Sequence, residues 1–322
     1  MRTRLTDILE ITHPVMLAGM GGVSYHRLVA AVSEGGGFGC MGASSMGDDR
    51  MVEEIAKVRE LTDKPFGVDL LTAAPGDLAA KVNMLADGGA RVFVAGLGIP
   101  RDVIELCHSR NVLVASMCGK VRHAIAAVEA GCDIVVAQGT EAGGHTGKIA
   151  TLALVPQVVD AVGEKVPVVA AGGIVDGRGM AAALSLGADG IWVGTRFIAT
   201  PEAHSTPGYK DALLRTNEDG TVVTKVYTGK TCRVIENSYT RAFDEAGGEA
   251  EPFPMQFIKS VQDGANHMGA DEDADGVDPD REFWPAGQGV GAIHEIVPAA
   301  DLVERFVKEA EQALGKATAY SA

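Results

Sequence analysis

The chain has 322 residues, of which 46% are hydrophobic, and this is enough to bury one large core. Its formal net charge of −15 excludes a surface built to neutralise phosphates, so we expect no nucleic-acid partner. The five cysteines are scattered without a C-x-x-C pair, which argues against disulfides and structural zinc and predicts a cytoplasmic location. Residues 1–10 are polar and no uncharged apolar run is long enough to span a membrane, so we expect neither a secretory signal nor a membrane partner.

Short apolar, β-branched runs alternate with helical patterns through the first 200 residues. We expect eight strands, at residues 15–18, 38–41, 66–70, 91–95, 112–116, 134–137, 166–170 and 190–193. We expect helices between them, at residues 25–34, 48–61, 77–87, 101–109, 120–130, 152–162 and 177–186. Parallel neighbours need helical crossovers, so eight regular units predict an α/β fold, a closed (β/α)8 TIM barrel in preference to an open doubly wound sheet.

The alternation stops after Thr200. Residues 201–285 are polar and Gly-rich, with at most a few short helices and a β-like run at residues 222–227. We predict that this segment is an insertion after strand 8 that covers the C-terminal face of the barrel, because loops of this length are usually functional or disordered. The barrel domain then comprises residues 1–200 and 286–322, and an amphipathic helix at residues 299–314 closes it.

Two loops of the predicted barrel have the composition of a phosphate site. Ligands of such barrels bind at the C-terminal ends of the strands, and phosphate often binds the loops after strands 7 and 8. Gly172 and Gly173 follow the seventh strand, and Gly194 and Thr195 follow the eighth. Glycines let backbone N–H groups approach an anion, and the threonine adds a hydroxyl donor. Tight turns would explain either segment alone, but the pair at these two places indicates phosphate.

One histidine follows the sixth strand in a run that is too rich in glycine for a helix. This is His145, within residues 138–147, and its ordinary pKa of ~6.5 suits proton transfer near neutral pH. We predict a catalytic or ligand-contacting role, with a structural loop histidine as the alternative. Glu141 could orient the imidazole or cap the following turn, and we favour the cap. At the end of strand 1, in residues 15–23, glycines would let a flat ring approach the backbone beside Met20.

These segments together resemble the nitronate monooxygenase (2-nitropropane dioxygenase-like) family. The resemblance covers the barrel and is carried by residues 16–22, 67–69, 138–147, 171–179, 187–200 and 284–288. It implies non-covalent FMN on a TIM barrel, with His145 near the reacting part of the flavin and the substrate. The implied cofactor contacts are Ala18, Gly19, Met20, Gly21, Asp69, Gln138, Gly143, Gly172, Gly173, Gly194, Thr195 and Gln288.

Two positions near the implied flavin depart from the pattern of this family. Met117 stands where some relatives carry a lysine, although Lys120 follows within a turn. Asp69 stands where relatives often have asparagine, and a carboxylate there would disfavour anionic forms of the flavin unless it binds the ribityl hydroxyls instead.

The resemblance implies an oxidoreductase of small molecules, with oxidation of alkyl nitronates by O2 as the leading function. Reduction of quinones by NAD(P)H and reduction or desaturation of enoyl thioesters of CoA or ACP are the alternatives within the family. A flavin-free, phosphate-binding lyase or isomerase is the alternative from another class, but Asp69 is its only obvious acid–base group at a strand end. A homodimer is compatible with the sequence, which does not define the assembly.

An acidic segment of the insertion matches the calcium-loop pattern D-x-D-x-D-G-x5-E. It spans residues 271–282, and its oxygen donors would be Asp271, Asp273, Asp275 and Glu282. The usual apolar residue after the central glycine turn is replaced by an aspartate, and the flanking segments are not amphipathic helices. We therefore predict a solvated acidic loop and no metal site.

Overall fold

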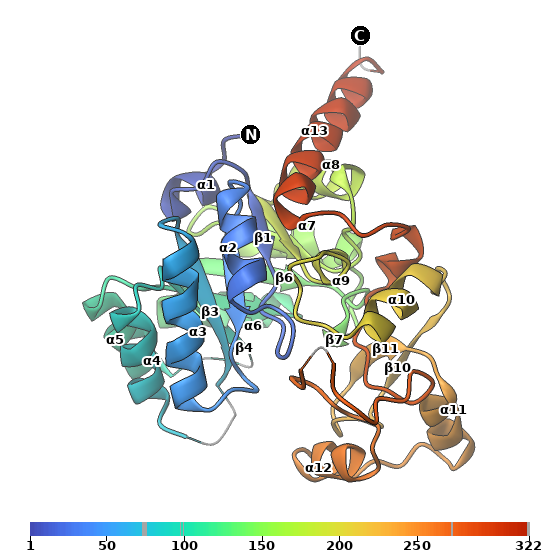
Figure 1. Ribbon diagram of the computed structural model, residues 1–322. Helices are drawn as coiled ribbons and strands as arrows, with labels where there is room; N and C mark the ends of the chain where they lie inside the picture. Colours follow the sequence, from blue (N-terminus) through green and yellow to red (C-terminus); the bar gives the residue numbers. More distant parts are fainter. Residues whose placement is uncertain (73–75, 97, 99, 272, 321–322) are drawn as a thin grey trace.

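The fold of the chain is seen in a computed structural model, which describes residues 1–72, 76–96, 98, 100–271 and 273–320. Eight parallel strands form one sheet with the order β1-β9-β8-β6-β5-β4-β3-β2 (Figure 1). They are β1 (Val15–Leu17), β2 (Gly39–Gly42), β3 (Phe66–Leu71), β4 (Val92–Gly96), β5 (Leu113–Cys118), β6 (Ile134–Gln138), β8 (Val168–Ala171) and β9 (Gly190–Val193). A parallel bridge between Met16 and Phe38 links the two ends of this order. The structure therefore confirms the predicted (β/α)8 barrel.

Helices lie outside the strands and bury the outer face of the sheet (Figure 1). They are α2 (His26–Glu34), α3 (Asp48–Leu61), α4 (Leu78–Asp87), α5 (Arg101–Ser109), α6 (Val121–Ala130), α7 (Thr151–Val162), α8 (Gly177–Ser185) and the short α9 (Thr195–Ile198). The N-terminal helix α1 (Arg4–Leu9) packs Leu5 and Leu9 onto the side chains that fill the barrel interior. Because α1 occupies the N-terminal end of the barrel, the C-terminal ends of the strands are left for a ligand.

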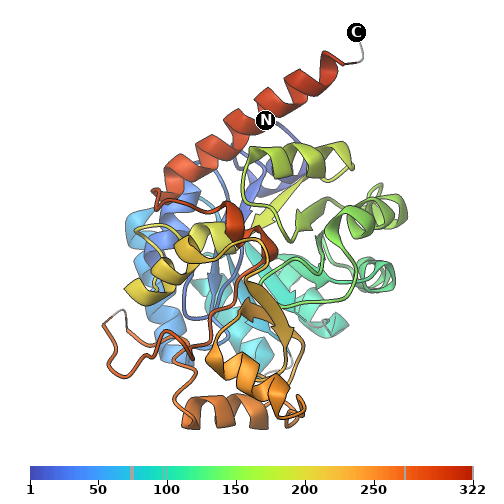
Figure 2. The same ribbon diagram turned by 90° about the vertical axis from the view of Figure 1, so that its right-hand side faces the viewer.

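The last helix, α13 (Ala299–Thr318), is the predicted amphipathic helix and continues four residues beyond the expected end. It packs along α8 (Figure 2). The two backbones approach closely at Gly177, where an added Cβ would lie 2.3 Å from Cβ of Glu309, and this contact requires glycine. No helix in the described part of the chain is both long and apolar enough to cross a membrane.

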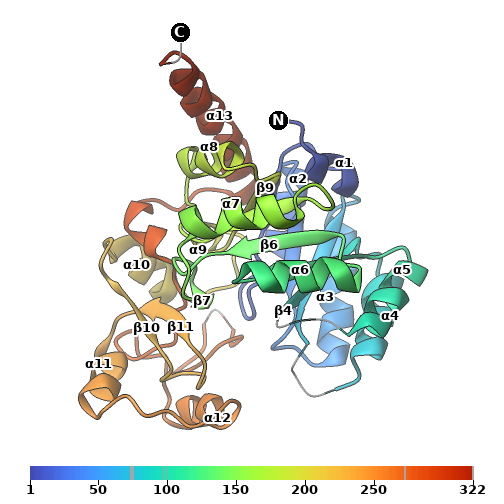
Figure 3. The same cartoon turned by 180° about the vertical axis from the view of Figure 1, so that it is seen from behind.

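Residues 201–285, which we call the insertion, fold beside the C-terminal ends of the strands (Figure 1). The insertion contains α10 (Pro207–Arg215), β10 (Thr221–Thr224), β11 (Cys232–Ile235), α11 (Ser238–Glu245) and α12 (Met255–Gln262), and a 3-10 helix, η1 (Gln288–Ala292), follows it. The predicted β-like run is thus a four-residue strand. β10 and β11 pair antiparallel, and β11 also pairs with β7 (Gly144–His145), a short strand of the barrel loop after β6 (Figure 3).

Candidate functional site

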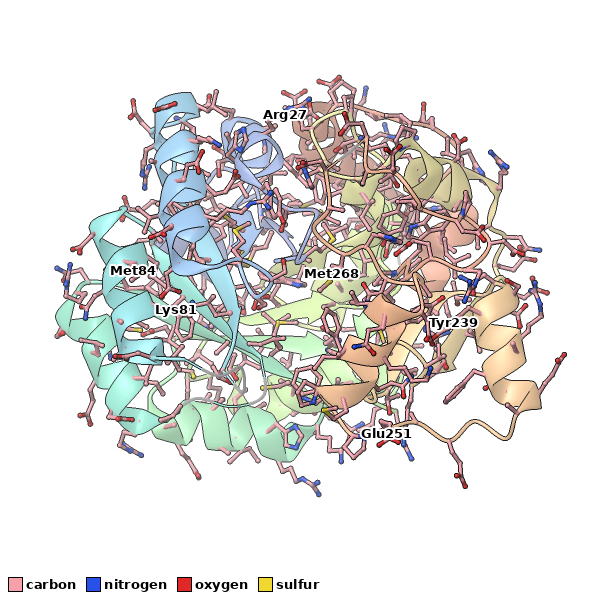
Figure 4. The ribbon with its side chains drawn as sticks, turned by 60° about the horizontal axis from the view of Figure 1, so that its bottom comes forward. Arg27, Lys81, Met84, Tyr239, Glu251 and Met268 are labelled. Carbon is pink, nitrogen blue, oxygen red and sulfur yellow. The ribbon has the colours of Figure 1, made fainter. Side chains whose placement is uncertain are left out.

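The C-terminal ends of the strands and the insertion together line a cavity of about 1140 Å³. Protein sites for a single small ligand usually measure ~300–1,000 Å³, so this cavity has room for more than one ligand. Met268 of the insertion lies where the two parts meet, and an added Cβ on Gly22 would be 3.1 Å from its Cγ (Figure 4). The site is therefore built jointly by barrel loops and the insertion.

The structure places the predicted site residues around this cavity, with one exception. The lining includes His145 and the predicted cofactor contacts Ala18, Gly19, Met20, Gly21, Asp69, Gln138, Gly143, Gly172, Gly173, Gly194 and Thr195. Gln288 lies instead in a smaller adjoining pocket behind Gly172 and Gly173, and its backbone N–H donates to the carbonyl of Glu141 at 2.9 Å. The main cavity is also lined by Met117, which stands where some members of the resembled family carry a lysine, and by Lys120.

The loops after β8 and β9 bring several glycines to one side of the cavity. Gly172 and Gly173 have φ values of +106° and +72°, a backbone conformation that favours glycine whatever space surrounds the residue. An added Cβ on Gly194 would lie 3.3 Å from Sδ of Met20, a close contact that the flexible methionine side chain would have to relieve by a small shift. The hydroxyl of Thr195 accepts a hydrogen bond from the Gly287 N–H at 3.0 Å. The loops leave the space beside their backbone open to the cavity, as a phosphate-bearing cofactor requires.

A buried hydroxyl adds to the polar groups of the cavity. Ser205 lines it, is only 8% exposed, and its Oγ has no hydrogen-bond partner among the described residues. A buried polar group without a partner costs free energy, and a bound ligand would supply the missing partner. Nothing in the sequence around Ser205 distinguishes it, because its position depends on the path of the insertion.

Asp69 lies on the inward side of β3, next to the turn after β1. An added Cβ on Gly19 would lie 2.2 Å from Cβ of Asp69, so the aspartate requires glycine at that position. Burial raises the pKa of Asp69 to about 8, because the low-dielectric surroundings disfavour the charged form. At neutral pH the side chain is therefore mainly a neutral carboxylic acid, which can donate a hydrogen bond into the cavity.

His145 lies on β7, opposite Cys232 of β11. Its Nε2 is 3.0 Å from Oγ1 of Thr228, and the side-chain amide of Gln138 donates to its carbonyl at 2.7 Å. Burial, and to a lesser extent the Lys230 ammonium, lower the pKa of His145 to about 4. The imidazole is therefore neutral at physiological pH and is held in place by contacts from both the barrel and the insertion.

Glu141 does not orient this imidazole. Its carboxylate accepts hydrogen bonds from the backbone N–H of Thr151 at 2.9 Å and from its hydroxyl at 2.8 Å. Thr151 begins α7, so the carboxylate satisfies a donor at the start of that helix, in agreement with the favoured interpretation of a cap. The hydroxyl that contacts His145 instead belongs to Thr228, which sequence reasoning missed because the two residues are 83 positions apart.

The acidic segment at residues 271–282 does not present its last carboxylate to a cation. Glu282 is 3% exposed, and its carboxylate binds Nδ1 of His267 at 2.6 Å and accepts from the backbone N–H groups of His267 and Phe283. Asp271, Asp273 and Asp275 lie on the surface or close to it. Among the described residues, no three His, Cys, Asp or Glu side chains are grouped to hold a metal ion.

Comparison with known proteins links this geometry to one group of enzymes. A family profile described as nitronate monooxygenase matches residues 2–81 and 72–309. A protein of Staphylococcus saprophyticus named "Probable nitronate monooxygenase" is 35% identical over 302 residues, with 79% of this chain and 84% of the relative covered. A relative from Mycobacterium tuberculosis named "(3aS,4S,5R,7aS)-5-hydroxy-7a-methyl-1-oxo-octahydro-1H-indene-4-carboxyl-CoA dehydrogenase" is 39% identical, with 79% and 71% covered. The structure of FabK from Thermotoga maritima superposes with a TM-score of 0.89 at 36% identity and covers 99% of both chains.

Proposed function

Because the chain belongs to the nitronate monooxygenase family, we propose that it is an FMN-dependent enzyme that oxidises alkyl nitronates with O2. The observation that carries this proposal is His145, a neutral imidazole held at the wall of a cavity large enough for a cofactor and a substrate. The family consists of oxidoreductases, so the open questions are the cofactor, the substrate and the roles of individual residues.

The cavity suits FMN as the resident cofactor. Gly172, Gly173, Gly194 and Thr195 would surround its phosphate, and the turn at residues 18–21 would lie against the ring. When bound, the flavin supplies the electron-transfer chemistry, accepting electrons from the organic substrate and passing them to oxygen. FMN is favoured over FAD because these paired loops suit one terminal phosphate.

The low pKa of His145 bears on which form of the substrate is used. An imidazole with a pKa of about 4 is a weak base, poorly matched to removing a carbon-bound proton at neutral pH. A nitronate has already lost that proton and carries a negative charge. His145 would then act as a neutral hydrogen-bonding group at the nitro oxygens, and Thr228 would keep its ring in position. This favours the preformed nitronate over the neutral nitroalkane.

A second candidate function, oxidoreduction of a CoA or ACP thioester, has independent support. One relative is named as a carboxyl-CoA dehydrogenase, and the cavity is much larger than a small nitronate needs. NAD(P)H-dependent quinone reduction is a further candidate within the family.

We also propose that the enzyme works in the reducing cytoplasm, since its free thiols are all buried: Cys40, Cys107, Cys118, Cys132 and Cys232.

Anaerobic mixing tests the proposal directly. The purified, flavin-loaded protein is mixed with a preformed nitronate, with the parent nitroalkane, or with NADH, while the flavin absorbance is followed. We expect rapid bleaching with the nitronate and slow or no bleaching with the nitroalkane. Bleaching by NADH alone would favour a reductase. A colourless protein that cannot be reconstituted with FMN would contradict the proposal.

A further inference from the structure

Three histidines in the described part of the chain pair with a carboxylate. The pairs are His26–Glu54, His108–Asp133 and His267–Glu282. The first two pairs lie outside the cavity lining, whereas both members of the third belong to it. An imidazole backed by a carboxylate is the usual arrangement of a catalytic base, so the pair that lies at the cavity is the one in a position to act on a ligand.

The carboxylate of Glu282 fixes one edge of the His267 ring. Its Oε2 lies 2.6 Å from Nδ1 of His267, while Oε1 accepts from the backbone N–H groups of His267 at 2.8 Å and of Phe283 at 3.0 Å. An ionised carboxylate can only accept hydrogen bonds, so the ring proton lies on Nδ1 and the lone pair on Nε2. Among the described residues Nε2 has no hydrogen-bond partner, and 27% of the His267 side chain is exposed. The nitrogen that can take up a proton is therefore the free one.

Packing within the insertion holds this pair in place. The backbone N–H of Phe283 donates to the carbonyl of Ala265 at 2.9 Å, and the Tyr227 hydroxyl donates to the carbonyl of Glu282 at 3.1 Å. Ala265, Tyr227 and Phe283 belong to one hydrophobic core of the insertion. This core therefore keeps the backbones that carry His267 and Glu282 side by side.

The residues after His267 lie against the turn that follows β1. An added Cβ on Gly22 would be 2.6 Å from the backbone nitrogen of Gly269 and 3.1 Å from Cγ of Met268. The preceding residues of this turn, 18–21, are those proposed to lie against the flavin ring. His267 therefore borders the part of the cavity that the ring would occupy, where a substrate must come to react.

Removal of a carbon-bound proton needs a base that His145 does not provide. Its pKa of about 4 makes it a weak base, and its Nε2 already contacts Thr228. In His267 the second ring nitrogen is free, and the carboxylate behind the ring would stabilise the imidazolium that forms when a proton is taken up. The two histidines therefore suit different steps, since His145 can hydrogen-bond to a nitronate and His267 can take the proton whose loss forms one.

We propose that His267 is a catalytic base that removes the proton from the carbon next to the nitro group of a neutral nitroalkane, with Glu282 as its positioning residue. The C–H bond breaks, its electron pair forms the C=N bond of the nitronate as the N=O π electrons move to oxygen, and the proton forms an N–H bond at Nε2. This step needs no oxidant, and the partly exposed ring can pass the proton to water. The inference rests on the proposed function, to which it adds a slower route that starts from the nitroalkane.

Exchange of the carbon-bound proton tests this step without relying on oxidation. The flavin-loaded protein is incubated anaerobically with nitroethane in deuterated water, and deuterium at the carbon next to the nitro group is followed by NMR. We expect the protein to accelerate the exchange and His267→Gln to lower the protein-dependent rate ~100-fold, the usual contribution of a positioned base. Glu282→Gln should lower it less, and added imidazole should restore exchange to His267→Ala.

The matched control is His26→Gln. His26 makes equivalent contacts, with its Nδ1 2.7 Å from Oε2 of Glu54 and its backbone N–H donating to the same oxygen at 3.2 Å. Its side chain is also 27% exposed, but it lies outside the cavity lining. This variant should exchange the proton as fast as the unmodified protein. Oxidation of preformed nitroethane nitronate, measured on every variant, shows whether a loss is specific to proton removal.

The outcomes keep the two proposals apart. Loss of exchange in His267→Gln, with recovery of His267→Ala by imidazole, supports the assignment of His267 whether or not a nitronate bleaches the flavin. If the unmodified protein does not accelerate exchange, or if His267→Gln exchanges equally fast, the assignment is wrong. It is also wrong if His267→Gln loses exchange and nitronate oxidation to the same extent and imidazole restores neither, because the pair then only supports the insertion. Failure of a preformed nitronate to bleach the flavin contradicts the proposed function alone.

Discussion

The barrel and the insertion contribute different kinds of chemistry to one cavity. The barrel supplies close backbone approaches, at Gly172, Gly173 and Gly194, where flat or anionic groups can lie against main-chain N–H groups. The insertion supplies side chains, among them Thr228, whose hydroxyl contacts the imidazole of His145. Changes in the barrel loops should therefore affect cofactor retention, and changes in or next to the insertion should affect turnover and choice of ligand.

The largest effect is expected from Gly173→Asp. A carboxylate at this position would add negative charge beside the proposed phosphate site and next to Glu141, whose Cβ would lie 3.2 Å from the added Cβ. We expect the variant to fold and to retain essentially no FMN, measured as flavin absorbance per protein after purification. Gly264→Asp is the control, because Gly264 also has a positive φ, +65°, but lies outside the cavity lining. Normal FMN content in Gly173→Asp would place the phosphate elsewhere.

His145→Ala should separate catalysis from cofactor binding. The proposed phosphate contacts lie after β8 and β9, so we expect this variant to keep FMN. Turnover with a nitronate should fall ~100-fold or more, the usual contribution of a positioned acid–base or hydrogen-bonding group. A preformed nitronate and its nitroalkane, compared in steady-state kinetics, then define the role. Equal losses indicate hydrogen bonding to the substrate, and a larger loss with the nitroalkane indicates a base.

A purely structural role for His145 would give the opposite pattern. The variant would lose stability and flavin, while the rate per bound flavin would hardly change. Thr228→Val tests the contact from the insertion, since it removes the hydroxyl at 3.0 Å from Nε2 but leaves the imidazole in place. A smaller loss of turnover than in His145→Ala is expected from it.

The same division between barrel and insertion explains what the sequence could predict. Each barrel strand lies within two residues of its expected ends, because apolar runs and helical periodicity are local signals. The pairing of β7 with β11 cannot be predicted from the sequence, since β7 has two residues in a Gly-rich loop and its partner is 87 positions away. For the same reason the position of His145 at the cavity could be predicted from its own loop, whereas the contact from Thr228 could not.

Asp69→Asn should stabilise the protein at neutral pH by at most about 4 kcal/mol, because about three pH units separate the unfolded-state pKa from neutrality and each is worth about 1.4 kcal/mol. The folded-state pKa of about 8 lies above the unfolded value of ~3.9, so the folded chain retains a proton that the unfolded chain releases between these values. Stability of the unmodified protein is therefore lost as the pH rises from about 4 to about 8. The gain in Asp69→Asn should disappear near pH 4 and be largest above pH 8, as measured by chemical denaturation across this range.

The matched control for this change is Asp211→Asn. Asp211 is an exposed residue of α10 that pairs with Arg215 at the surface, and its loss should change the unfolding free energy by less than about 0.5 kcal/mol. If Asp69→Asn proves destabilising at pH 7, the carboxylate must have a partner that favours its charged form. Asp69 would then be ionised beside the cofactor, and its proposed contribution as a hydrogen-bond donor would be wrong.

The smallest effect, none at all, is expected from calcium. EGTA should leave the melting temperature and activity unchanged, and added calcium should not raise them. The reason is specific to Glu282, which a calcium loop needs as a bidentate ligand at its last position. Its carboxylate is already bound to Nδ1 of His267 and to two backbone N–H groups, so coordination would require breaking these contacts inside a buried site.

A rise of several degrees in melting temperature with calcium would show that this rearrangement occurs. Glu282→Gln would then have to abolish the rise, because removal of the charged ligand would leave the three aspartates without their partner on the cation.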